Sequence, residues 1–323
     1  MTFPVFDLHC DTSSALLGRS MNEAGSLLKN KGHIDLTRAA GFSGYCQCFG
    51  CFTTPDMEKW FGISPTVVFE RELATIQREV YRNREKIGIV YSPEEIEENR
   101  AAGKMSAVLT LEGTAGIHYD PGLLENLYQI GFRISSLGWN ESNPLTGSHL
   151  TGEGLSEQGR EYVRQAQRLG ILVDVSHISD RGFWDILDMT ESPVIATHSN
   201  SRAVWNHSRN LTDEMFLAIC KTGGVAGFNQ YADFIGDKPT LDSVCDHILH
   251  FLELEPSGKH LALGGDLDGC EAFAEGFTGI ESYPTMARQL LTRGVGEETV
   301  MDIFWNNAMG VMRSAVRNHK KSD

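Results

Sequence analysis

A histidine and a carboxylate stand two residues apart near the start of the chain, at His9 and Asp11. They end a short apolar run that predicts a β-strand over residues 4–10, and residues two apart in a strand project from the same face. An imidazole and a carboxylate placed side by side form a ligand pair for a divalent metal ion. Because short motifs often match by chance, this pair alone does not establish a site.

Four more ligand-type side chains end later strand-like runs. They are Glu112, His177, His198 and Asp266. Each one alone is explained by a backbone hydrogen bond or a helix cap, but six such residues at the ends of five strands point to one site. Three histidines and three carboxylates suit Zn²⁺ or a similar borderline ion. They are too many for one tetrahedral ion, and they suit two ions bridged by a carboxylate, about 3.5–4 Å apart.

Strand-like runs alternate with helical patterns along the whole chain, which favours parallel β/α units. The expected strands are 4–10, 44–52, 105–112, 132–139, 171–177, 193–198, 223–230 and 260–266. Helical patterns cover 64–86, 121–131, 156–169, 179–190, 212–222 and 240–254, several beginning at caps such as Ser179, Thr212 and Thr240. Eight such units predict a (β/α)8 TIM barrel, in which catalytic groups lie at the carboxyl-terminal ends of the strands. No G-x-G-x-x-G follows the first strand, which disfavours a dinucleotide-binding fold.

We expect a single barrel domain over residues 1–316, followed by a charged tail over 317–323. The connection 53–104 is longer than a standard unit, and we interpret it as an insertion because no Gly/Pro/Ser-rich linker brackets it. The amphipathic segment 297–316 carries an apolar stripe that includes Val300, Ile303, Phe304 and Met309. We expect this segment to complete the outer ring of helices.

The charge and cysteine content restrict the partners and the compartment. A formal net charge of −15 argues against nucleic-acid or anionic-membrane binding, because phosphate groups demand a basic surface. No run approaches the roughly 20 apolar residues that span a bilayer, and the first residues lack the pattern of a signal peptide. The seven cysteines are spread along the chain, so we expect a reduced, cytoplasmic protein. Cys46, Cys48 and Cys51 are interpreted as core residues of a strand.

Five motifs together resemble the membrane (renal) dipeptidase family of zinc metallopeptidases. They are the segments 7–11, 111–113, 174–179, 197–202 and 264–269, in the order found in that family. The resemblance implies a TIM-barrel dipeptidase that hydrolyses small dipeptides, including those with a C-terminal D-residue. It implies that His9 and Asp11 hold one Zn²⁺, that His177 and His198 hold the other, and that Glu112 bridges them. Asp266 would lie beside the first ion and shuttle the proton.

The resemblance also suggests residues that bind the substrate. Arg209 occupies the position of an arginine that binds the C-terminal carboxylate, and Tyr231 is a further expected contact. Animal members carry a histidine at the end of strand four that contacts the substrate carbonyl, whereas this chain has Trp139, whose indole N–H can still donate a hydrogen bond. His149 is a candidate substitute there, but we favour a solvated loop residue. His33, His118 and His207 show no ligand spacing and are expected at the surface.

Two other functions stay open from the sequence. One is an amidohydrolase-like barrel acting on another amide, a lactone or a phosphoester, although such barrels usually carry H-x-H on strand one and a lysine on strand four, which are missing here. The other is a non-catalytic metal-binding barrel that has lost turnover, which would leave the six ligands poorly explained. Besides a small dipeptide substrate, the expected partner is a second copy of the chain, since two-fold dimers are the commonest assembly.

Overall fold

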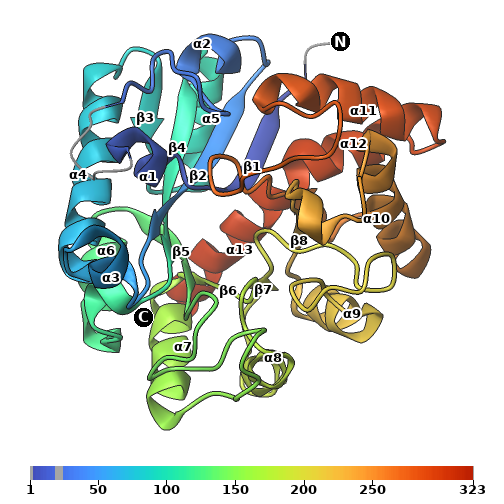
Figure 1. The fold of residues 1–323 in the computed structure, drawn as a ribbon. Helices are drawn as coiled ribbons and strands as arrows, with labels where there is room; N and C mark the ends of the chain where they lie inside the picture. Colours follow the sequence, from blue (N-terminus) through green and yellow to red (C-terminus); the bar gives the residue numbers. More distant parts are fainter. Residues whose placement is uncertain (1–2, 19–24, 323) are drawn as a thin grey trace.

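A computed structural model describes residues 3–18 and 25–322, which form a parallel β-barrel surrounded by helices (Figure 1). The barrel strands are β1 Val5–Cys10, β2 Tyr45–Phe52, β4 Met105–Glu112, β5 Phe132–Ser136, β6 Leu172–Asp174, β7 Val194–Ile195, β8 Ala226–Phe228 and β9 Leu261–Leu263. They are hydrogen-bonded in the order β7-β6-β5-β4-β2-β1-β9-β8, and a parallel bridge between Ala196 and Ala226 joins the two ends. The predicted (β/α)8 barrel is confirmed.

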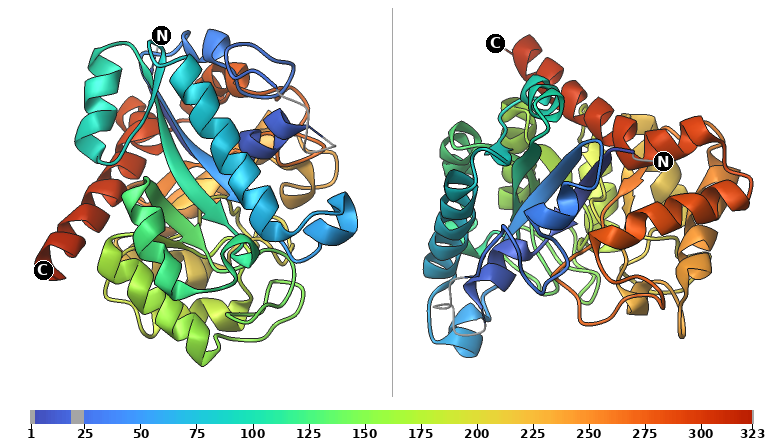
Figure 2. Two further views of the ribbon diagram at one scale, coloured as in Figure 1. Left: turned by 90° about the vertical axis from the view of Figure 1, so that its left-hand side faces the viewer. Right: turned by 90° about the horizontal axis from the view of Figure 1, so that it is seen from above.

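Helices cover the outside of the barrel (Figure 2). They are α1 Thr12–Leu17, α2 Leu36–Ala39, α3 Met57–Phe61, α4 Pro65–Arg82, α5 Pro93–Ala101, α6 Leu124–Gln129, α7 Glu157–Leu169, α8 Asp180–Leu187, α9 Asp213–Thr222, α10 Leu241–Leu254 and α11 Tyr283–Thr292. The cap residues expected at Ser179 and Thr212 accept hydrogen bonds from the first turns of α8 and α9, and Thr240 forms a capping box. Within the described residues, no helix has the length and apolar character needed to cross a membrane.

The long connection 53–104 carries α3, α4, β3 and α5. The strand β3, Ile87–Ile89, pairs with β4 alone and lies outside the closed ring. The helix α3 follows directly after β2, at the carboxyl-terminal end of the barrel strands. The insertion therefore contributes residues to the end of the barrel where catalytic groups are found.

A β-bulge in β1 sets the direction in which the side chain of His9 points. Asp7 lies opposite Gln47 and Cys10 lies opposite Phe49, so β1 has one residue more than β2 between these two pairs. The side chain of Asp7 faces the outside of the barrel, where its carboxylate accepts a hydrogen bond from Tyr283 of α11. Strict alternation would place the side chain of His9 on this same outer face. The extra residue reverses the alternation, as bulges do, and turns His9 toward the barrel axis.

The C-terminal helices close the amino-terminal end of the barrel. The segment forms α12 Glu297–Met301, a π-helical stretch Asp302–Asn306, and α13 Asn307–Ser322, which crosses behind the strands in Figure 1. Trp305, Met309 and Met312 pack in one cluster with inward-facing side chains of the barrel strands, such as Phe6 and Leu8. The expectation that this segment joins the outer ring holds only for its first part, since Val300, Ile303 and Phe304 lie in the core cluster that includes Tyr283 and Ala287 of α11. From Trp305 onward its apolar side chains cover the open end of the barrel instead.

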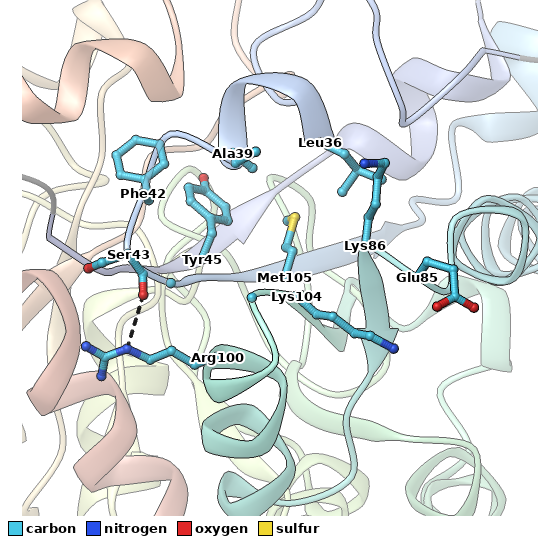
Figure 3. A pocket seen from close by; sticks show the side chains of 13 residues that line it. Leu36, Ala39, Phe42, Ser43, Tyr45, Glu85, Lys86, Arg100, Lys104 and Met105 are labelled. Carbon is cyan, nitrogen blue, oxygen red and sulfur yellow. Dashed lines mark hydrogen bonds between the residues drawn. The ribbon is translucent and has the colours of Figure 1, made fainter.

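Two hollows lie at opposite ends of the barrel. One of about 380 Å³ lies among residues that precede β2, β3 and β4, including Phe42, Lys86 and Lys104 (Figure 3). It therefore sits at the amino-terminal ends of the strands, where TIM barrels do not carry their active sites. The other, of about 400 Å³, includes Asp11, Glu112 and Asp266 among its lining residues. We call this second hollow the cleft.

Candidate metal centre and active site

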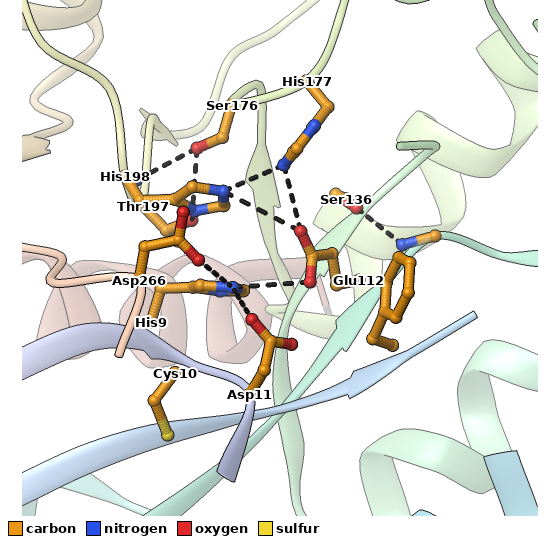
Figure 4. Close-up of polar contacts among 12 residues, drawn as sticks. His9, Cys10, Asp11, Glu112, Ser136, Ser176, His177, Thr197, His198 and Asp266 are labelled. Carbon is orange, nitrogen blue, oxygen red and sulfur yellow. Dashed lines mark hydrogen bonds and ion pairs between the residues drawn. The ribbon is translucent and has the colours of Figure 1, made fainter. Parts of the chain in front are cut away.

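The six expected ligands meet at the carboxyl-terminal end of the barrel, where Figure 4 shows them pointing toward one another. All are at most 9% exposed. They are His9 and Asp11 at the end of β1, Glu112 at the end of β4, His177 after β6, His198 after β7 and Asp266 after β9. Residues up to 257 positions apart thus share one buried polar cluster, because the parallel strands all end at the same rim.

The carboxylate of Glu112 lies between two groups of ligands. Its Oε2 lies 3.4 Å from Nε2 of His9, whereas its Oε1 lies 3.0 Å from Nε2 of His177 and 3.8 Å from Nε2 of His198. Figure 4 shows the two oxygens turned toward opposite sides. A carboxylate with its two oxygens toward different ligands is able to bridge two ions. His9 and His198 also lie close together, with their rings stacked 3.9 Å apart, and with Glu112 they form one group that could hold an ion.

The side chains around β1 fit a cation. Nε2 of His9 lies 3.3 Å from Oδ2 of Asp11 and 3.9 Å from Oδ1 of Asp266, and the three atoms are close enough to hold one ion. Nε2 of His9 and Oδ1 of Asp11 are buried without a hydrogen-bond partner among the described residues. A Cβ on Gly269 would lie 2.0 Å from Asp11, so this glycine keeps the space beside the carboxylates open. Orphaned buried donors and acceptors of this kind suit a metal ligand set.

The backbone at Asp266 is strained. Its φ of 53° lies in the left-handed region, which is uncommon for residues other than glycine. Its Oδ2 accepts a hydrogen bond of 3.0 Å from Nδ2 of Asn229, which fixes the direction of the carboxylate. Such strain is typical of functional positions held by the surrounding structure.

His198 is oriented by a chain of hydrogen bonds behind it. Its Nδ1 lies 2.7 Å from Oγ1 of Thr197, whose hydroxyl donates to Oδ2 of Asp174 at 2.6 Å. Asp174 also accepts hydrogen bonds from the backbone and hydroxyl groups of Ser176. Because Thr197 gives its proton to Asp174, its oxygen accepts from Nδ1 of His198, which leaves Nε2 of His198 unprotonated and able to bind a metal.

Asn140 orients His177 in a similar way. Its Oδ1 lies 2.8 Å from Nδ1 of His177 and 3.0 Å from Nε2 of His149. His149 also contacts the hydroxyl of Ser208 at 2.7 Å. The interpretation of His149 as a solvated loop residue is wrong, since it is half-buried in this network. Sequence reasoning missed Asn140, because nothing in its local pattern reveals a hydrogen bond to a histidine 37 positions away.

We expect the Asn140→Leu variant to bind metal more weakly by about 10–100-fold, the usual effect of removing a partner that orients a ligating histidine. Competition with a chelator measures this affinity. The control is Asn306→Leu, which changes an exposed asparagine far along the chain and should keep wild-type affinity. Unchanged metal affinity in Asn140→Leu would show that His177 is oriented by other contacts.

The buried ligands perturb one another electrostatically. Burial, together with the negative charge of Asp11, raises the pKa of Glu112 to about 8. Burial also lowers the pKa of His177 and His198 well below the usual value, and the charge of Arg209 adds to this shift. Neutral imidazoles are the form that binds metal, and a bound cation would offset the repulsion between the carboxylates.

Arg209 is buried beside the histidine ligands, with 3% of its surface exposed. Its Nη2 lies 3.2 Å from Nε2 of His177, and its Nη1 donates to the hydroxyl of Ser199 at 3.3 Å. The guanidinium also lies over the ring of Phe234, 5.3 Å from its centre. Its Nε has no hydrogen-bond partner among the described residues. A buried guanidinium with a free N–H is suited to an anionic ligand.

Arg202, another cation on the loop after β7, is already paired. Its two terminal nitrogens contact the carboxylate of Asp180 at 2.7 and 2.8 Å, on the exposed side of the same loop. Arg209 is therefore buried with an N–H group left for a ligand, whereas the guanidinium of Arg202 is already bound to a carboxylate.

Trp139 and Tyr231 both line the cleft. The ring of Trp139 lies 6.1 Å from that of His177 and packs against Phe52 and Trp60. Tyr231 lines a different part of the cleft, with its ring 4.9 Å from that of Phe234. The structure therefore places Trp139 within an aromatic cluster of the cleft.

The structure also shows where the remaining histidines and the clustered cysteines from the sequence analysis lie. His33 and His207 are half-buried rather than superficial: His33 contacts Asp268, and Nδ1 of His207 accepts from the backbone N–H of Arg209. His118 is exposed, as expected. The three clustered cysteines, Cys46, Cys48 and Cys51, are buried in β2 without a disulfide, which confirms their interpretation as core residues.

Comparison with known proteins assigns the chain to a family. Over residues 1–323 the sequence matches the family described as membrane dipeptidase, peptidase family M19. An uncharacterized dipeptidase of Schizosaccharomyces pombe is 32% identical over 217 residues, which are 65% of this chain and 53% of that protein. A second one from the same organism is 34% identical over 204 residues, 60% of this chain and 49% of that protein. The chain thus spans about half the length of these curated relatives.

Solved structures share the fold over nearly the whole chain. A metallopeptidase from Rhodobacter sphaeroides, solved with a phosphinate mimic of the dipeptide L-Ala-D-Ala, has a TM-score of 0.86 at 24% identity, covering 98% of this chain and all of that one. A structure described as dipeptidase AC, a metallopeptidase of family M19, has a TM-score of 0.85 at 25% identity, covering 98% of this chain and 99% of that one. On the match along its full length, the chain belongs to the membrane dipeptidase family, peptidase family M19.

Proposed function

We propose that the protein is a dipeptidase that uses two divalent metal ions, with Zn²⁺ as the expected metal. The observation that carries this proposal is the position of Glu112, whose Oε2 lies 3.4 Å from Nε2 of His9 and whose Oε1 lies 3.0 Å from Nε2 of His177. His9 and Asp11 would hold one ion, His177 and His198 the other, and Asp266 lies beside the first group. When bound, two such ions supply Lewis acidity to the scissile carbonyl and to the attacking water.

The other residues supply proton transfer and substrate binding. In this proposal the carboxylate of Asp266 accepts a proton from the attacking water and returns it to the leaving amine. Arg209 would pair with the free C-terminal carboxylate of the substrate, and Tyr231 and Trp139 would line its path. A buried arginine that binds a terminal carboxylate selects short peptides, because a longer peptide leaves the guanidinium unpaired.

A panel of dipeptides tests this function. Metal-free protein is reconstituted with Zn²⁺ and assayed for release of free amino acids from L,L-dipeptides and from dipeptides with a C-terminal D-residue. The expected result is hydrolysis that depends on the metal and is lost with tripeptides. Hydrolysis of lactones or phosphoesters, with no action on dipeptides, would favour the amidohydrolase-like alternative.

We expect Glu112→Gln to lose at least one metal ion per chain, since an amide is a weaker ligand than a carboxylate and cannot bridge two cations equally well. Elemental analysis of purified protein measures the content. Glu79→Gln is the control, because Glu79 is an equally buried glutamate on α4, outside the ligand cluster. Two ions and full activity in Glu112→Gln would remove the bridging role.

The free cysteines support a location for this enzyme. All seven cysteines are unpaired, which is typical of a reducing compartment. We propose that the protein is cytoplasmic and that residues 1–316 act as one catalytic unit, a barrel that carries the 53–104 insertion at the rim of its cleft.

A further inference from the structure

One side of the cleft is built from aromatic rings. Trp139 stands between Phe52, at the end of β2, and Trp60, on α3 of the insertion. The ring centres of Phe52 and Trp139 are 5.0 Å apart, and those of Trp60 and Trp139 are 5.9 Å apart. The planes meet at 65° and 87°, in the edge-to-face geometry that aromatic pairs favour. We call these three residues the aromatic wall.

The aromatic wall is accessible from the cleft. All three of its residues line that hollow, and Met57 and Phe61 of α3 lie beside them. Trp60 is 43% exposed, so a large part of its indole is not covered by the protein's own packing. Apolar surface that stays open inside a binding cleft favours contact with an apolar ligand group.

The topology places two members of the aromatic wall, Phe52 and Trp60, across the barrel from the expected carboxylate site, whereas Trp139 follows β5 and lies nearer to His177. Arg209 follows β7, and the strand order around the closed barrel places β2 on the far side from β7. Glu112 and the other ligands lie between them. A dipeptide with its carboxylate at Arg209 and its peptide bond at the ligands therefore extends its N-terminal residue toward β2, and a dipeptide is about 7 Å long.

We infer that the aromatic wall selects dipeptides whose N-terminal residue carries an aromatic or large aliphatic side chain. This inference rests on the proposed dipeptidase function and names its substrate class. Packing of such a side chain against the exposed indole of Trp60 removes apolar surface of both partners from water. Small N-terminal residues such as glycine or alanine leave the aromatic wall uncovered and gain none of this stabilisation.

Trp60 can be substituted without disturbing the buried core. It is half-exposed and its ring packs against those of Phe61 and Trp139 in the cleft, so its removal leaves no large cavity in the core. Trp184 is a matched control, since it is 40% exposed and lies on α8, on the outside of the barrel. A general effect of removing a surface tryptophan would appear in both variants.

The test compares kcat/KM of Zn²⁺-reconstituted wild type, Trp60→Ala, Trp60→Phe and Trp184→Ala. The substrates are phenylalanyl-alanine, leucyl-alanine, alanyl-alanine and the reversed peptide alanyl-phenylalanine. Wild type should prefer phenylalanyl-alanine over alanyl-alanine by at least about tenfold, the range in which apolar pockets discriminate side chains. Trp60→Ala should lose most of this preference through a higher KM, whereas Trp60→Phe and Trp184→Ala should keep it.

Two results would overturn the inference. One is the same preference in Trp60→Ala as in wild type. The other is a Trp60-dependent preference for alanyl-phenylalanine, which would mean that the wall contacts the C-terminal residue.

A separate measurement keeps this inference distinct from the proposed function. If reconstituted wild type hydrolyses none of the peptides, the dipeptidase function fails, and calorimetric titration with phenylalaninamide and alaninamide then tests the aromatic wall alone. Tighter binding of phenylalaninamide that is lost in Trp60→Ala supports the wall, and equal binding of the two amides overturns it.

Discussion

The Asp266→Asn variant is expected to lose about 10²-fold or more in kcat for dipeptide hydrolysis, the usual scale for removal of a general acid–base. Asp266 is buried, its Oδ1 lies 3.9 Å from Nε2 of His9, and Asn229 fixes its other oxygen. An asparagine has nearly the same shape but cannot accept a proton from water. Steady-state kinetics together with metal analysis measure the effect, and the metal content should stay largely unchanged.

Asp268 provides the control for this variant. Its two oxygens accept hydrogen bonds from the hydroxyl of Thr12 and the backbone N–H of His33, at 2.7 Å each, so it orients the loop after β9. Asp268→Asn should therefore lower kcat much less than Asp266→Asn. Near-native turnover in Asp266→Asn with a large loss in Asp268→Asn would move the proton shuttle to Asp268.

The Arg209→Ala variant should lose roughly 2–5 kcal/mol in kcat/KM for free dipeptides, the range for removing one partner of a buried charge pair. Burial lowers the pKa of Arg209 to about 10, so the guanidinium stays charged at neutral pH. Its unpartnered Nε is available for a carboxylate oxygen. A dipeptide amide lacks the full charge, so kinetics with the amidated substrate should show a much smaller loss.

Arg202→Ala is the matched control, because Arg202 lies on the same loop but already binds Asp180. It should keep the difference between free and amidated dipeptides. Equal losses on both substrates in Arg209→Ala would show that Arg209 supports the loop, and the recognition of the carboxylate would then need another cation.

The barrel could be predicted because the alternation of strand and helix patterns is a local property of the sequence. The ligands followed from the same reasoning, since parallel strands end at one rim and each ligand stands at a strand end. The position of α13 could not be predicted in this way. Its apolar stripe shows that one face is buried, but the partner surface, which includes Phe6 and Leu8 inside the barrel, is set by the tertiary fold.

The residues that orient the ligands could not be predicted from the sequence either. The contacts of Asn140 with His177 and of His149 with Ser208 join positions far apart in the chain, and no local pattern marks them. The bulge in β1 is a second example, because it depends on pairing with β2. Long-range hydrogen bonds of this kind follow only from the three-dimensional arrangement.

Titration of metal-free protein with Zn²⁺ tests the central claim most directly, with bound metal and the rate of dipeptide hydrolysis followed in the same samples. The two groups of ligands on either side of Glu112 predict that the rate reaches its maximum at two ions per chain. Full activity at one ion per chain, or activity in metal-free protein, would contradict the account.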